Sequence, residues 1–137
     1  MNPVCHRALI INEAGSIQYR DVLDELDMFR ELIGCEVIDI RLWWIGSHRF
    51  GFVIDDDGRL KKRKPTVFGP NADPVFVGTV LVFGLKASED GTDFCSLTEQ
   101  EEKLLENCMA TFAIDDRTVL TSVTQREFAP WRLEGSE

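Results

Sequence analysis

The sequence has few of the residues that build metal centres, with four cysteines and two histidines among 137 residues. No two cysteines are separated by two residues, whereas closed zinc sites usually bring their ligands as close pairs. The acidic run 55–57 fails the calcium-loop pattern, because Gly58 comes too early and Thr66 stands where that pattern needs a glutamate. We therefore expect no metal and no cofactor, and free thiols in a reducing cytoplasm.

The recognised signatures of catalysis are also missing. The chain has no Gly-x-Ser-x-Gly nucleophile elbow, no phosphate-binding loop of the Gly-x-x-x-x-Gly-Lys type and no dinucleotide fingerprint. Ser47 and His48 are neighbours, but nothing in the sequence supplies the third group that orients a catalytic base. The absence of these motifs predicts a protein that is not an enzyme.

No apolar run is long enough for a signal peptide or a membrane span. The N-terminus has one short apolar run, 8–11, and the longest later stretch, 75–85, contains Gly78, Thr79 and Gly84. A length of 137 residues fits one domain with a real core. We expect a single cytoplasmic domain over residues 1–137, with 131–137 a frayed tail.

Positive charge is scarce, with 15 Lys and Arg against 24 Asp and Glu, a net charge of −9. This balance argues against broad binding to nucleic-acid phosphates, which cations drive. The acids follow predicted helix faces, a pattern that fits either ordinary solvated faces or a mimic of nucleic acid that inhibits a DNA-binding enzyme. Five of the 15 cations stand within residues 59–64, so one local site could still bind an anion.

Hydrophobic periodicity predicts an α+β fold, with a mostly antiparallel sheet and one or two helices packed on one face. Gly34 is placed to cap the first helix, Gly78 to form a bulge or a close approach, and Thr98 with Glu101 to form a capping box. The predicted strands cover 7–11, 17–19, 37–45, 50–54, 75–83 and 117–123, and the predicted helices 21–33 and 99–112.

The strand at 37–45 alternates, and its apolar face predicts burial of Ile38, Ile40, Leu42 and Trp44. Trp43 falls on the other face. It is therefore either covered by a terminal segment or exposed at an interface, where tryptophan is enriched.

The basic run at 59–64 has three interpretations. It could be a solvated strand edge that discourages aggregation. It could clamp a phosphate-bearing ligand through Arg63 and Lys64, with backbone amides near Gly69 and Asn71. It could dock an acidic partner protein. The candidate contact residues of the whole chain are then Trp43, Arg59, Lys62, Arg63, Lys64 and Asn71.

Five short segments stand in a recognisable order between about residues 7 and 110. They are Phe29-Arg30-Glu31-Leu32-Ile33-Gly34, Glu36-Val37-Ile38, Asp56-Asp57-Gly58-Arg59-Leu60, the run 77–84 and the run 93–98. Their order resembles a family of short proteins of unknown function, found mainly in phages and other mobile elements. A Gly-Leu-Pro-x-Asn-type segment that this family usually carries after the hairpin is replaced here by Lys61-Lys62-Arg63-Lys64-Pro65.

The resemblance implies a mobile-element origin and supplies no mechanism. With the missing catalytic motifs, it leads us to expect a non-enzymatic accessory protein that binds a host protein in the host cytoplasm, as a monomer or as a homo-oligomer. The alternative is a small-molecule binder that sequesters a phosphate-bearing signalling nucleotide at the basic run. The acidic mimic is the third hypothesis.

Overall fold

A computed structural model describes residues 4–45, 47–69, 73–89, 91–111 and 116–121. Two helices and ten strands make up this part of the chain, and the fold is α+β as the periodicity predicts. The elements in order are β1 (Cys5–Ile11), β2 (Ile17–Leu23), α1 (Leu26–Ile33), β3 (Ile38–Ile45), β4 (His48–Asp55), β5 (Pro65–Phe68), β6 (Pro74–Val77), β7 (Val80–Ser88), β8 (Gly91–Cys95), α2 (Glu99–Glu106), β9 (Met109–Thr111) and β10 (Thr118–Leu120).

The strands form two sheets. The six-stranded sheet has the order β2-β1-β7-β4-β3, and β8 pairs with the C-terminal part of β7, from Gly84 to Ser88. Every pair in this sheet is antiparallel. The four-stranded sheet has the order β6-β5-β10-β9 and contains one parallel pair, β10 with β5. The sequence did not predict this second sheet, because its strands are only three or four residues long.

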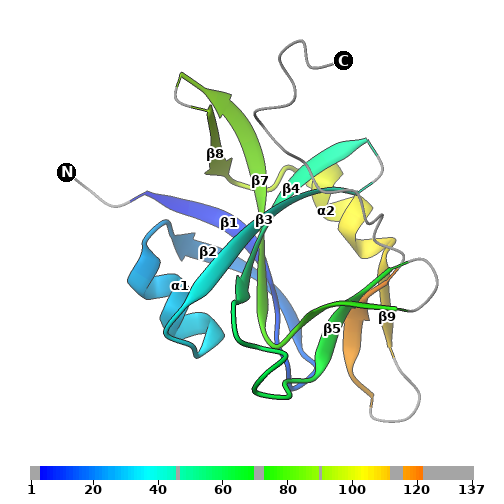
Figure 1. The fold of residues 1–137 in the computed structure, drawn as a ribbon. Helices are drawn as coiled ribbons and strands as arrows, with labels where there is room; N and C mark the ends of the chain where they lie inside the picture. Colours follow the sequence, from blue (N-terminus) through cyan, green and yellow to red (C-terminus); the bar gives the residue numbers. More distant parts are fainter. Residues whose placement is uncertain (1–3, 46, 70–72, 90, 112–115, 122–137) are drawn as a thin grey trace, which may run out of the picture.

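Both faces of the six-stranded sheet are buried, by different partners. α1 covers one face, hereafter the helix face, while the four-stranded sheet, hereafter the small sheet, lies on the opposite side of the molecule in Figure 1. The core under α1 includes Phe29, Ile33 and Phe83. The core on the other face includes Phe52 from β4, Phe76 from β6 and Leu105 from α2, so α2 packs with the small sheet. Successive apolar side chains of β1 and β7 point alternately into one core and into the other.

The first helix is shorter than the predicted range 21–33. Residues 17–23 pair with β1 along its whole length, from Ile17 opposite Ile11 to Leu23 opposite Cys5. Val22, which falls inside the predicted helix, is instead buried in the sheet. Gly34 does cap the helix in the left-handed conformation, as predicted.

The second helix begins as predicted and ends early. The Thr98 hydroxyl accepts from the Glu101 amide, and the Glu101 carboxylate accepts from the Thr98 amide, which completes the capping box. The helix stops at Glu106 because the following residues pair as β9 with β10. Cys108 packs against the core just after the helix rather than on it. The predicted strand 117–123 is confirmed over Thr118–Leu120.

The hairpin of β3 and β4 is confirmed, but the predicted buried face of β3 is wrong. Trp43 is 8% exposed and packs on Phe76 with ring centroids 4.8 Å apart, whereas Ile40 is 46% exposed. The small sheet supplies the cover for the Trp43 face, and the eight-residue α1 does not extend over Ile40. No helix among the described residues is long and apolar enough to cross a membrane.

Candidate protein-binding site

The basic run lies in a loop that carries the chain from one sheet to the other. This basic loop, residues 56–64, joins β4 to β5 as a series of turns. It is not the strand edge that one interpretation predicted, because the strand that follows, β5, lies inside its sheet between β6 and β10. Backbone bonds from Lys61 to Asp57, from Lys62 to Arg59 and from Arg63 to Gly58 hold the loop in shape.

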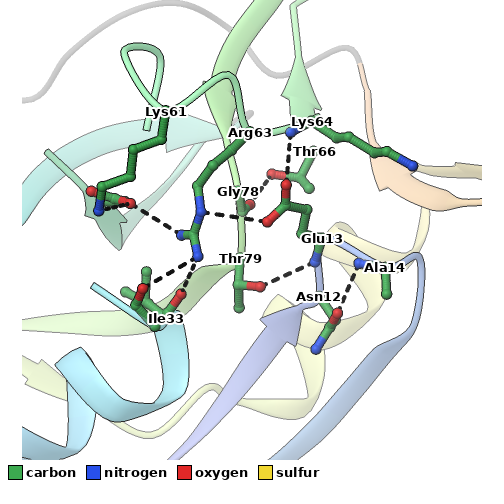
Figure 2. A network of polar contacts seen from close by, with 12 residues as sticks. Asn12, Glu13, Ala14, Ile33, Lys61, Arg63, Lys64, Thr66, Gly78 and Thr79 are labelled. Carbon is green, nitrogen blue, oxygen red and sulfur yellow. Dashed lines mark hydrogen bonds and ion pairs between the residues drawn. The ribbon is translucent and has the colours of Figure 1, made fainter. Parts of the chain in front are cut away.

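The Arg63 side chain connects the loop to three other segments of the chain by hydrogen bonds and ion pairs (Figure 2). Its Nη2 donates to the Ile33 carbonyl at 2.8 Å, and its Nε lies 3.4 Å from a carboxylate oxygen of Glu13. Its Nη1 lies 3.2 Å from Asp55 Oδ2, an ion pair without hydrogen-bond alignment, and the Asp55 side chain is 1% exposed. The guanidinium therefore already has its anionic and carbonyl partners within the chain, which weakens the phosphate-clamp interpretation.

Gly78 leaves the space that the Arg63 side chain occupies. Its φ of 79° is left-handed, and a Cβ there would lie 2.8 Å from Arg63 Cδ. The close approach predicted at Gly78 is confirmed, and it divides the predicted strand 75–83 into β6 and β7. The Gly78 carbonyl also accepts the Thr66 hydroxyl at 2.6 Å.

Of the other four cations in the loop, two bind partners in the described part of the chain and two do not. Arg59 donates to the Val75 carbonyl at 3.0 Å, and Lys61 pairs with Asp55 at 3.0 Å. Lys62 and Lys64 are exposed, and within the described residues their ammonium groups have no partner. The Lys64 side chain points away from the network in Figure 2, while its backbone amide donates to Glu13. The sixth candidate residue, Asn71, lies outside the described residues.

Two candidate residues, Trp43 and Arg59, line one shallow hollow beside the loop. This polar hollow of about 270 Å³ is also lined by Arg41 and by the carboxylates of Asp39, Asp55 and Asp56, so acids outnumber cations in it and disfavour an anionic ligand. The Trp43 indole N–H is buried without a hydrogen-bond partner, a loss of about 1–3 kcal/mol. The structure thus brings Trp43 and Arg59 together in a site that suits a phosphate poorly.

A second hollow lies on the helix face, and the sequence did not single it out. This apolar hollow has a volume of about 340 Å³. Ile40 and Leu42 form one of its walls. The alternation of β3 marks these two residues as an apolar face, and this apolar face is the sequence signal that could have indicated the hollow. The residues that line it are Asp24, Phe29, Ile40, Leu42, Leu85, Thr92, Asp93 and Phe94.

The floor of the apolar hollow is aromatic and closely packed. Phe94 stacks on Phe83 with centroids 4.5 Å apart and an interplanar angle of 4°, and Phe29 lies 5.5 Å from Phe83. Gly51 on β4 lets Phe94 lie flat on the sheet, because a Cβ at Gly51 would be 2.5 Å from that ring. Packed aromatic rings make this floor a preformed surface, not a mobile one.

The charged residues that line the apolar hollow are acidic. They are Asp24 and Asp93, and the described lining residues include no Lys or Arg. Asp24 lies 3.0 Å from the His6 ring. Asp93 stands opposite Lys86 in the β7–β8 pair, and strand alternation turns both side chains to the face opposite Phe94. An apolar floor with the Asp24 carboxylate at the rim suits an apolar group that carries a cation beside it.

The thiols give no sign of a nucleophile. Burial raises the pKa of Cys35, Cys95 and Cys108, which disfavours the reactive thiolate. His48 lies 3.8 Å from Glu101, a residue already committed to the capping box of α2. Within the described residues, no three His, Cys, Asp or Glu side chains are grouped to hold a metal.

Comparison with known proteins identifies a family. The family model described as a domain of unknown function, DUF3846, matches residues 6–110. This match confirms the resemblance to an unknown-function family over about residues 7–110. No curated protein and no solved structure matches the chain.

Proposed function

The chain belongs to the DUF3846 family, and we propose that it acts without catalysis, by binding another protein at the apolar hollow. The observation that carries this proposal is the hollow itself, a preformed apolar site with an acid at its rim. The resemblance to proteins of phages and mobile elements makes a host protein the expected partner.

The size of the site supports a side-chain anchor. A volume of about 340 Å³ is at the lower end of the range for small-molecule pockets, which is enough for one large apolar side chain. Protein interfaces concentrate their affinity in a few anchors that fill such sites. Ile40, 46% exposed, offers an apolar contact in the wall of the hollow, and Leu26, 49% exposed, begins α1 two residues after Asp24.

The charge supports a basic partner segment. Asp24 at the rim attracts cations, and the whole chain carries a net charge of −9. We therefore expect a partner segment with one large apolar residue and Lys or Arg close to it. Such electrostatic attraction acts mainly on the association rate and on the choice of partner.

Selection from a library of displayed random peptides tests the proposal. The immobilised full chain is expected to enrich peptides that combine an apolar residue with Lys or Arg, and Ile40→Asp is expected to lose them. Gln18→Asp adds the same charge on the exposed side of β2, at the far edge of the sheet, and is the matched control. Enrichment that persists on Ile40→Asp, or no enrichment on the wild-type chain, would contradict the proposal.

A further inference from the structure

The chain carries on its own surface a segment of the kind that the apolar hollow suits. Leu60 is 84% exposed, the most exposed of the large hydrophobic residues described. Arg59 and Lys61 are its immediate neighbours in the basic loop, and Lys62 follows. An apolar side chain among cations is the complement of an apolar floor with a carboxylate at its rim.

The loop holds Leu60 in place. Arg59, the residue before Leu60, donates a hydrogen bond to the Val75 carbonyl. Lys61, the residue after Leu60, forms an ion pair with the buried Asp55. Lys62 adopts a φ of 57°, a left-handed conformation that few non-glycine residues take and that the surrounding bonds must maintain. A leucine presented on an ordered loop loses little conformational entropy on binding.

Leu60 and the apolar hollow cannot meet within one molecule. Leu60 lines the polar hollow with Trp43 and Phe76, on the side of the six-stranded sheet that faces the small sheet. The apolar hollow lies on the opposite, helix face with Phe29 and Phe94. Contact between them requires two copies of the chain.

We propose that Leu60 of one copy inserts into the apolar hollow of another, with the basic loop beside Asp24. This inference rests on the proposed function, because it assigns an occupant to the same hollow. The contact is heterologous: each copy has one Leu60 to give and one hollow to fill, so repetition leads to rings or open chains. The buried surface is small, so the association is transient and weakens as salt screens the charges. Self-association then competes with any foreign partner for the hollow.

Mixing two variants tests this geometry directly. Leu60→Asp keeps the hollow and loses the insert, and Ile40→Asp keeps the insert and loses the hollow. In sedimentation velocity, each variant alone is expected to stay monomeric at concentrations where the wild-type chain and Gln18→Asp associate. The mixture is expected to form a one-to-one heterodimer, because exactly one productive contact remains. Unfolding curves for each variant establish that it is folded.

The outcomes separate the two proposals. A wild-type chain that stays monomeric while peptides still bind at Ile40 would overturn the self-association alone. A wild-type chain that associates while the mixture stays monomeric would also overturn it, since some other surface would then be responsible. If the mixture forms the heterodimer and no displayed peptide binds, the self-association stands and the proposed binding of a foreign protein fails.

Discussion

Replacing Arg63 by alanine tests whether the basic loop is built for structure or for an anion. In the wild-type chain the Arg63 side chain is 17% exposed and joins the basic loop to the end of α1, to Glu13 and to the buried Asp55. Arg63→Ala removes all three contacts at once. It leaves the Ile33 carbonyl without this donor and leaves Lys61 as the remaining cation beside Asp55.

The magnitude follows from these contacts. A hydrogen bond from a charged donor, such as that to Ile33, contributes about 1.5–3 kcal/mol. Breaking a buried ion pair costs about 3–5 kcal/mol when the other charge is left alone, but here Lys61 still compensates Asp55. We therefore expect Arg63→Ala to lower the free energy of unfolding by about 3 kcal/mol.

Urea unfolding measures this loss, and two further variants give it meaning. Lys64→Ala removes a neighbouring cation with no side-chain partner in the described residues and is expected to change stability by less than about 0.5 kcal/mol. Arg63→Lys keeps the charge but not the planar fork, so it is expected to fall between the two. Equal small losses from Arg63→Ala and Lys64→Ala would refute the structural role of Arg63 and restore its candidacy as a ligand contact.

Three further predictions concern local features. Thr98→Ala is expected to cost about 1 kcal/mol in urea unfolding through the lost capping box, whereas Thr98→Ser keeps most of it; equal losses would contradict this. Burial, together with the charges of Glu106 and Glu102, raises the pKa of Tyr19 to about 12, above the ordinary value of 10. The unfolded chain therefore loses this proton first, and stability is expected to fall as the pH rises from about 10 to about 12, a fall that Tyr19→Phe removes. Of the four thiols, the exposed Cys5 is expected to react first with a thiol reagent at neutral pH, and Cys5→Ser to abolish the fast phase, because burial raises the pKa of Cys35, Cys95 and Cys108.

Local signals in the sequence predicted the features that local chemistry determines. The cap at Gly34, the capping box at Thr98 and the hairpin of β3 and β4 depend on residues close together in the chain, and all three are present. The close approach at Gly78 was predicted as a feature of the backbone. Its partner, Arg63, comes from a segment 15 residues away, which spacing alone does not reveal.

The errors arise where a distant segment decides burial. Trp43 is buried because β6 places Phe76 on it, and Ile40 is exposed because α1 is only eight residues long. Alternation along β3 shows that the strand has two unlike faces, but which face is covered depends on strands that come later in the chain. The same limit hid the apolar hollow, since its walls come from β3, β7 and β8, together with Asp24 and Phe29 from in and near α1.

The most direct measurement of the central claim is the affinity of a selected peptide for the apolar hollow. Isothermal titration of such a peptide into the wild-type chain and Gln18→Asp is expected to give equal affinities that fall as salt is raised. Ile40→Asp is expected to bind about fourfold to tenfold more weakly, because Ile40 is 46% exposed before binding and so loses about half of the roughly 1.5–3 kcal/mol that full burial of such a side chain contributes. An unchanged affinity for Ile40→Asp would contradict the assignment of the hollow as the binding site.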